Sequence, residues 1–189
     1  MKIILATNNQ GKVNELKSLF NTNIYSLNDL NIDIDIIEDG NTLEENAKIK
    51  ATSIVKLFPN DIVIADDTGL FINSLNGRPG VYSARYAFDG CNNEDNIDKI
   101  LEELANFDDR SAFFKTVIVL YKNNEYYYYD GVLHGEILKS RSGSNGFGYD
   151  SVFYNKHFNK SLASLTKAEK NCISHRSLAI KKLINSKII

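Results

Sequence analysis

Apolar runs alternate along the chain with segments whose apolar residues recur at helical spacing. Residues 2–7 form a run that predicts a buried strand, and residues 12–20 then space their apolar side chains for one face of a helix. Isoleucine alternates with aspartate at residues 32–36, which predicts a strand with one face in water. Residues 42–58 have the pattern of a second helix, which stops before Pro59.

The second half of the chain adds a hairpin to this alternation. Residues 62–65 predict another buried strand, and residues 94–104 predict a helix with one apolar face. Residues 112–121 and 125–133 predict two strands joined by a turn at Asn123-Asn124. A final helical region closes the chain. Because helices alternate with strands early and the hairpin comes late, we expect an α/β fold with a mixed sheet.

Composition narrows the class of protein without identifying a function. A length of 189 residues suggests one domain or two closely joined lobes, and the net charge of -2 provides no global basic field for nucleic acid. Cys91 and Cys172 have neither metal-type spacing nor a disulfide framework. The first residues turn polar too early for a signal peptide, and no apolar run approaches transmembrane length. We therefore expect no membrane partner and a cytoplasmic location.

Residues 62–69 carry the most chemical information. Their apolar run stops at two adjacent carboxylates, Asp66 and Asp67, which are followed by a hydroxyl and a glycine. Successive strand residues point to opposite faces, so both carboxylates cannot lie in an apolar interior without partners. Ligands and metals bind at the carboxyl ends of strands in open α/β sheets, so a reaction centre is one interpretation. An Asp-rich turn is the other.

Phosphate and metal ligands are available in three further places. Residues 7–12 form a strand-to-helix turn whose backbone N–H groups and Lys12 suit phosphate, although the P-loop spacing is absent. Glu38 could join the aspartates in holding Mg²⁺, which binds one or two carboxylates plus phosphate oxygens. Lys50 lies within the second predicted helix. Taken singly, these features are more typical of a capped helix, a solvated acidic turn and a surface lysine.

The glycine-rich loop at residues 145–150 suits a nucleotide base. Glycines on both sides of Phe147 let the backbone approach a ligand, and the ring can stack on a base. A tight turn with a core phenylalanine is the alternative. A polar cluster near the last helix adds donors for a base edge: Lys170, Ser174, His175 and Arg176.

Taken together, six blocks of this chain resemble the inosine triphosphatase family, whose bacterial members are dITP/XTP pyrophosphatases. The blocks stand in the family's order and span nearly the whole chain. Thr68 replaces the serine that is more usual in the family and keeps its hydroxyl. The blocks are residues 7–12, 42–50, 65–70, 80–86, 146–150 and 174–176.

The resemblance implies a fold, a reaction and a set of roles. It implies a single two-lobed α/β domain over residues 1–189, with a long mixed sheet, flanking helices, a nucleotide in the cleft and a homodimer. It also implies Mg²⁺-dependent hydrolysis of ITP, dITP and XTP to the monophosphate and pyrophosphate. Asp67 would be the general base, and Glu38 and Asp67 would hold the metal. The substrate-binding residues would be Thr7, Asn8, Asn9, Gln10, Gly11, Lys12, Lys50, Thr68, Phe147, Gly148, Tyr149, Asp150, Lys170, His175 and Arg176.

Two other classes of function stay open. The carboxylate-Thr-Gly grouping also suits a phosphatase with an aspartyl nucleophile that acts on small phosphorylated metabolites. The aromatic run at residues 126–129, together with Phe147, suits a non-catalytic nucleotide-binding or RNA-binding module. The slightly acidic chain argues against RNA, because phosphate contacts dominate the affinity for nucleic acid.

Overall fold

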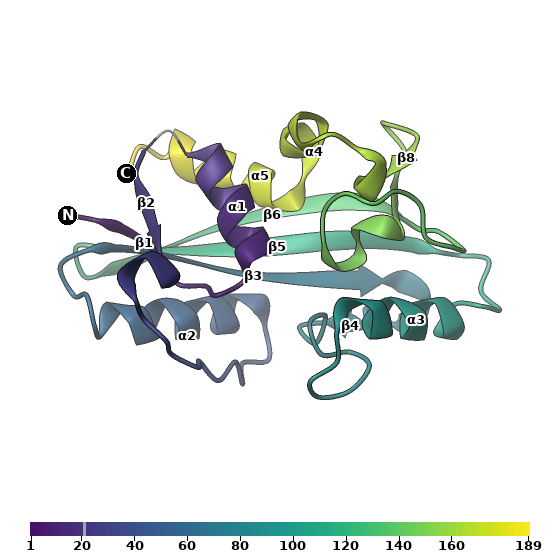
Figure 1. The fold of residues 1–189 in the computed structure, drawn as a ribbon, viewed down its shortest axis with the longest axis horizontal. Helices are drawn as coiled ribbons and strands as arrows, with labels where there is room; N and C mark the ends of the chain where they lie inside the picture. Colours follow the sequence, from purple (N-terminus) through teal and green to yellow (C-terminus); the bar gives the residue numbers. More distant parts are fainter. Residues whose placement is uncertain (21) are drawn as a thin grey trace. The chain divides into compact units, whose positions relative to one another are not determined.

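A computed structural model describes residues 1–20 and 22–189 and contains an eight-stranded mixed sheet (Figure 1). Its strand order is β2-β1-β3-β5-β6-β7-β8, and β4 pairs with β3. The strands are β1 (Ile3–Leu5), β2 (Ile24–Ser26), β3 (Ile62–Ile72), β4 (Pro79–Gly80), β5 (Ser111–Lys122), β6 (Glu125–Ile137), β7 (Phe153–Asn155) and β8 (Lys160–Ser161). The helices are α1 (Gln10–Leu19), α2 (Leu43–Val55), α3 (Asn93–Glu103), α4 (Lys167–Ile173) and α5 (His175–Asn185).

The chain divides into two compact units. Unit 1 comprises Met1–Asp67, Thr116–Gly131 and His175–Ile189, and unit 2 comprises Thr68–Lys115 and Val132–Ser174. The division falls within β3, β5 and β6, so each of these strands contributes residues to both units.

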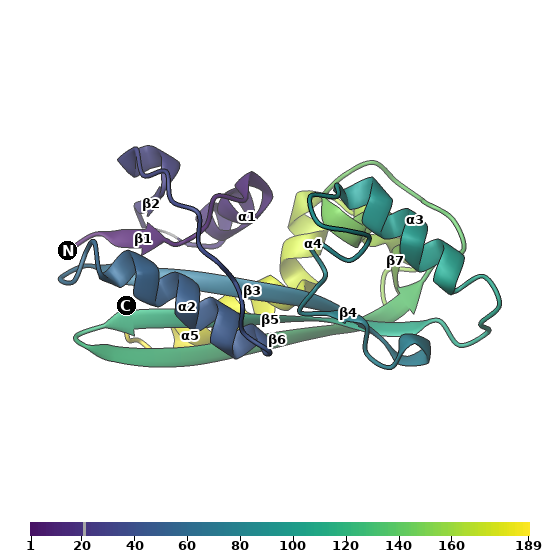
Figure 2. The same ribbon diagram turned by 90° about the horizontal axis from the view of Figure 1, so that it is seen from below.

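In unit 1, the parallel strands carry helices on both faces. β1 pairs in parallel with β2 and with β3, so that Ile3 lies opposite Ile24 and Ile62. In Figure 1, α1 and α5 lie on one side of these strands and α2 lies on the other. Figure 2 shows α2 running along β3. The buried core on the α1 and α5 side consists of Leu5, Leu16, Phe20, Ile24, Ile62, Ile64, Ile118, Leu120, Ala179, Ile180 and Leu183.

Unit 2 has its own hydrophobic core. β7 runs antiparallel to β6 and to β8, and α3 packs against the short 3₁₀ helix Gly148–Ser151. The core consists of Leu70, Ile72, Leu75, Ile97, Ile100, Leu104, Ala112, Phe114, Leu133, Ile137, Tyr149, Val152, Phe153, Leu162 and Leu165.

Four predicted elements are confirmed within two residues at each end: β1, α1, α3 and β5. α2 ends three residues before its predicted end, and β6 runs four residues beyond its predicted end. The hairpin is present, and both residues of its turn have positive φ: 52° at Asn123 and 64° at Asn124. Such a pair of left-handed residues matches the twist of the flanking strands, and asparagine tolerates this conformation well. Within residues 1–20 and 22–189, no helix is long and apolar enough to span a membrane.

The strand predicted at residues 32–36 is wrong. Residues 32–40 have no regular secondary structure, although within residues 32–36 the isoleucines are half-buried and the aspartates exposed, as the alternation indicates. Alternation reports an extended segment with one apolar face, whereas a strand also needs a hydrogen-bonded neighbour. The short strand β2, over Ile24–Ser26, was not predicted, because three residues are too few to establish a period.

The strand predicted to end before Asp66 is longer than expected. β3 runs through both aspartates to Ile72, because its second half pairs with β4, Leu70 lying opposite Gly80. Pairing between β1 and β3, in contrast, ends where Ala6 N–H donates to the Ile64 carbonyl. The two aspartates therefore lie within a strand, but just past the end of its parallel neighbour.

Candidate active site

Strand geometry sends the two adjacent carboxylates to opposite faces of the sheet. Asp66 shares the face of Ile62 and Ile64, and it meets side chains from α1 and α5. Asp67 meets Lys50, which comes from α2 on the other face. Both aspartates are buried. Each carboxylate is therefore held by cations from a different helix layer, and this satisfies the need for partners that a buried charge creates.

Asp66 lies at the centre of a buried charge network in unit 1. Its Oδ2 is 3.1 Å from Lys12 Nζ and 3.2 Å from Arg176 Nε, and its side chain is 0% exposed. Arg176 Nη1 also donates to the Glu15 carboxylate. Burial alone would raise the pKa of Asp66, but the Lys12 and Arg176 charges outweigh burial and hold that pKa far below its usual value. Asp66 is therefore an anion paired with two cations.

On the other face, Lys50 joins the two carboxylates predicted to hold metal. Its Nζ lies 2.7 Å from Glu38 Oε2 and 3.0 Å from Asp67 Oδ1, and its side chain is only 8% exposed. Burial raises the pKa of Asp67, and the nearby Lys50 ammonium opposes this effect only in part. Burial would lower the pKa of Lys50, yet the carboxylates of Asp67, Asp66 and Glu38 raise it. The trio is a compact set of one cation and two anions, in which Lys50 and Asp67 are buried and Glu38 is partly exposed.

Glu38 owes its place to a residue that the sequence did not single out. Gly40 N–H donates to Asn46 Oδ1 at 2.8 Å, and a Cβ added at Gly40 would come within 2.7 Å of that oxygen. Asn41 N–H donates to the Glu45 carboxylate at 2.7 Å. Side chains in the first turns of α2 therefore hold, by hydrogen bonds, the backbone that begins two residues beyond Glu38. The sequence signal that could have identified this contact is Asn46, which lies one turn before Lys50 on the buried face of α2. A buried amide needs hydrogen-bond partners.

The turn between β1 and α1 has the predicted helix-start geometry. Asn9 is the N-cap of α1 and accepts a hydrogen bond from Lys12 N–H at 3.1 Å, while Thr7 Oγ1 accepts from Asn9 N–H. Asn8 and Gln10 are exposed. The helix N-terminus leaves donor N–H groups near the turn, and Lys12 adds a cation beside them.

In unit 2, Phe147, Asp150 and Lys170 form a compact group. Lys170 Nζ lies 2.6 Å from Asp150 Oδ2 and 5.1 Å from the centre of the Phe147 ring, and Phe147 N–H donates to the same carboxylate. Gly146 has φ of 81°, and a Cβ there would lie 2.0 Å from Asp150 Oδ2. A glycine is therefore required beside this carboxylate. The predicted tight turn and the predicted ligand loop describe the same geometry.

Tyr149 connects this loop to a second hydrogen-bond chain within unit 2. Its buried hydroxyl donates to the Ser83 carbonyl at 2.7 Å. The Ser83 hydroxyl in turn accepts from Leu70 N–H at 2.8 Å and donates to the Gly80 carbonyl at 2.6 Å. Burial raises the pKa of the Tyr149 hydroxyl, which stays a neutral donor. Ser83 thus ties the strand that follows Thr68 to the loop that carries Tyr149.

The predicted site residues therefore form two sets. Unit 1 contains the turn residues Thr7–Lys12 with Glu38, Lys50, Asp67, His175 and Arg176, and unit 2 contains Thr68, residues 147–150 and Lys170. His175 and Arg176 are buried at the start of α5, and the Arg176 guanidinium is engaged by carboxylates.

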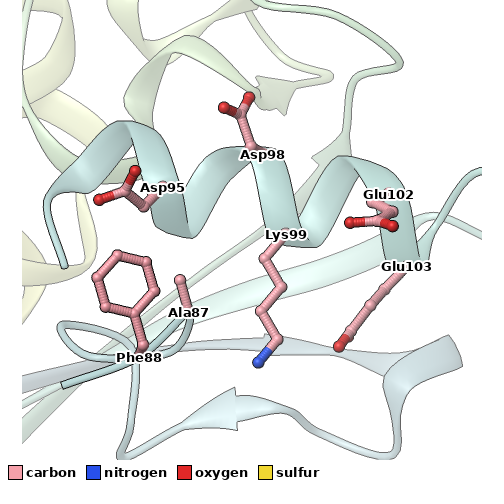
Figure 3. Close-up of a pocket in the computed structure, with 7 residues that line it drawn as sticks. All are labelled: Ala87, Phe88, Asp95, Asp98, Lys99, Glu102 and Glu103. Carbon is pink, nitrogen blue, oxygen red and sulfur yellow. The ribbon is translucent and has the colours of Figure 1, made fainter.

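A hollow of about 500 Å³ beside α3 contains none of the predicted site residues (Figure 3). Its lining is rich in acidic side chains, and Lys99 Nζ donates to the Tyr86 carbonyl at 2.8 Å. The lining residues are Ala87, Phe88, Asp95, Asp98, Lys99, Glu102 and Glu103.

The donor set of unit 1 fits Mg²⁺. Among the residues that the structure describes, no group of three or more His, Cys, Asp or Glu side chains is placed to hold a metal by itself. Glu38 and Asp67, however, converge on a single cation, the Lys50 ammonium. Mg²⁺ typically takes one or two carboxylates and completes its shell with water and substrate phosphates. The two carboxylates would hold the metal only as part of a larger set that includes the ligand.

An α/β fold whose sheet carries buried carboxylates paired with lysines is suited to binding a polyanion together with a divalent cation. The comparison with known proteins is specific: a model of the Ham1 family matches residues 3–186, and the chain belongs to that family.

Relatives and solved structures agree with this assignment over nearly the full length. A dITP/XTP pyrophosphatase of Thermoanaerobacter pseudethanolicus is 51% identical, covering 98% of this chain and 96% of that protein. A dITP/XTP pyrophosphatase of Christiangramia forsetii is 47% identical, covering 97% of each. The Ham1 protein structure from Staphylococcus aureus has a TM-score of 0.86 and 43% identity, covering 97% of this chain and 96% of that one. The structure of a HAM1 protein from Coxiella burnetii has a TM-score of 0.88 and 38% identity, covering 98% of each chain.

Proposed function

We propose that this protein hydrolyses deaminated purine nucleoside triphosphates, ITP, dITP and XTP, to the monophosphate and pyrophosphate. The observation that carries the proposal is the trio of Glu38, Lys50 and Asp67, in which two carboxylates converge on one buried ammonium. Relatives about half identical to this chain bear the name dITP/XTP pyrophosphatase. The arrangement of the three side chains and the names of the relatives therefore support the same reaction.

In this proposal, the residues of unit 1 act on the triphosphate. Lys12, Lys50 and the N–H groups of the turn at residues 7–12 bind phosphate oxygens and offset their charge. Glu38 and Asp67 hold Mg²⁺, which when bound supplies further charge neutralisation and polarises a water molecule. Asp67 takes the proton of the attacking water, whose oxygen bonds to the α-phosphorus as pyrophosphate leaves.

The base and sugar are assigned to a second group of side chains. Phe147 offers a ring for stacking, and Gly148, Tyr149 and Asp150 shape the loop around it. Thr68 adds a hydroxyl. Hydrogen-bond donors from Lys170, His175 and Arg176 suit the 6-oxo group of hypoxanthine and xanthine, which accepts hydrogen bonds. Adenine presents a 6-amino donor there, and a guanidinium has no acceptor to offer it. Leaving such donors unpaired is costly, so ATP is rejected.

We also propose that the enzyme acts as a homodimer in the cytoplasm and has no nucleic-acid partner. The family resemblance supports the dimer, and the near-neutral charge of the chain supports the absence of nucleic acid.

The test is hydrolysis of ITP, dITP, XTP, ATP and GTP with and without Mg²⁺, with pyrophosphate and phosphate measured separately. Asp67→Asn should keep its fold and lose roughly 10²–10⁴-fold in turnover of ITP, which is the usual contribution of a general base. Asp33→Asn, at an exposed position, is the control and should keep full activity. Near-normal turnover by Asp67→Asn would remove the role given to Asp67. Release of phosphate instead of pyrophosphate would favour the phosphatase, and salt-sensitive RNA binding without turnover would favour the binding module.

A further inference from the structure

The Lys50 ammonium occupies the space between the two carboxylates that are assigned to the metal. One nitrogen lies within hydrogen-bond distance of both Glu38 Oε2 and Asp67 Oδ1, at 2.7 and 3.0 Å. A cation bound by both oxygens and the ammonium cannot share that space, and their like charges would repel strongly in so buried a place. Lys50 and the divalent cation are therefore alternatives.

We propose that Lys50 is an internal counter-ion, which neutralises Glu38 and Asp67 until the divalent cation arrives with the nucleotide. The cation then displaces the ammonium, which turns to the triphosphate. This inference rests on the proposed function, because it uses the same carboxylates and the same substrate. It adds an order of events: the Lys50 ammonium leaves the carboxylates as the divalent cation binds there, and the ammonium then contacts the phosphates.

Three features of the chain permit this exchange. Lys50 is anchored by its backbone within α2, whereas its ammonium lies at the end of a flexible four-carbon stem. The backbone two residues beyond Glu38 is held separately, through the hydrogen bond from Gly40 N–H to Asn46. Asp67 is held by β3. Movement of the ammonium therefore leaves both carboxylates in place.

The first experiment measures Mn²⁺ binding without nucleotide, by electron paramagnetic resonance, for the wild type and for Lys50→Met. The variant removes the competing ammonium and keeps the length of the side chain. Its Mn²⁺ affinity should rise by about tenfold or more, because the cation no longer displaces an ammonium from two carboxylates. Its affinity for ITP should fall. A merely structural lysine would lower both affinities.

Two matched variants accompany this measurement. Lys48→Met removes an exposed lysine of the same helix and should change Mn²⁺ affinity less than about threefold. Lys50→Arg keeps the charge and should bind Mn²⁺ no more tightly than the wild type. Mn²⁺ should also raise the melting temperature of Lys50→Met more than that of the wild type, since a ligand stabilises the fold in proportion to its affinity.

A second experiment needs no variant and covers the case in which Lys50→Met does not fold. Acetylation of lysines in the wild-type protein, read by mass spectrometry, should label Lys50 faster when Mn²⁺ is added, while Lys12 keeps its rate. Unchanged or slower labelling of Lys50, or Mn²⁺ affinity in Lys50→Met no higher than in the wild type, would overturn the exchange. Unchanged ITP affinity in Lys50→Met would overturn the second step of the proposal, in which the ammonium moves to the triphosphate.

Hydrolysis of ITP by the wild type tests the proposed function separately. If ITP is hydrolysed but Lys50→Met binds Mn²⁺ no better, the exchange fails and the function stands. If Mn²⁺ affinity rises in the variant but the wild type hydrolyses none of the triphosphates, the counter-ion stands and the function fails.

Discussion

Replacing Asp66 with asparagine tests whether its buried carboxylate holds unit 1 together. The substitution keeps the size of the side chain and removes its charge. This leaves Arg176 with the Glu15 carboxylate and removes the carboxylate partner of Lys12. Arg176 is 3% exposed and Lys12 is 15% exposed at the side chain, so water cannot replace the lost anion cheaply. Breaking a buried ion pair by removing one partner costs roughly 3–5 kcal/mol.

That cost converts into a large change in unfolding. In a protein of this size each kcal/mol lowers the melting temperature by roughly 2–4 °C, so we expect a decrease of about 6–20 °C. The stabilisation by Asp66 depends on pH in a defined direction. Because its pKa in the folded protein is lower than in the unfolded chain, the contribution is present above the unfolded pKa. It is lost only in strong acid, as pH falls through the folded value.

Urea unfolding, followed by far-ultraviolet circular dichroism and by tyrosine fluorescence, measures the free energy of unfolding. The matched control is Asp130→Asn, which removes an exposed ion pair with Lys182 and should cost less than about 1 kcal/mol. Lys12→Met combined with Asp66→Asn leaves one cation, Arg176, and one anion, Glu15. The double variant should therefore be more stable than the sum of the single effects predicts. Equal costs for Asp66→Asn and Asp130→Asn would refute the reasoning.

Two further predictions concern the substrate-binding groups. Burial lowers the pKa of Lys12 more than the Asp66 carboxylate raises it, so kcat/KM for ITP should fall at a pH below the usual lysine value of 10.5, as the phosphate-binding charge is lost. Lys12→Arg should move this fall to higher pH, and a pH profile that is identical in the variant would contradict the role of Lys12. Gly146→Ala drives a Cβ into the Asp150 carboxylate and should lower the melting temperature well beyond Gly148→Ala, whose Cβ would meet no atom within 4 Å. Gly148→Ala carries only the left-handed backbone cost of about 1–2 kcal/mol, and equal melting temperatures for the two variants would show that Asp150 yields easily.

Local patterns determined the parts of the fold that depend on near neighbours in the chain. The helices are set by apolar spacing and caps, and the turn at Asn123-Asn124 by residues that accept positive φ. The same patterns failed at residues 32–36, where alternation was present but, in the part of the chain that the structure describes, no strand pairs with the segment. The predicted end of β3 was also wrong, because the second half of this strand pairs with β4, and the residues of β3 alone do not reveal that partner.

For the site, the sequence alone determined which chemical groups were available and that Asp66 and Asp67 point to opposite faces of a strand. Only the tertiary structure decided their partners. Arg176 reaches Asp66 from 110 residues away, and Lys50 bridges Glu38 and Asp67 from a different helix layer. The physical reason is that periodicity encodes which face of an element is buried. Which charge lies opposite which depends on how the elements pack, and the strong coupling between charges out of water then sets the chemistry.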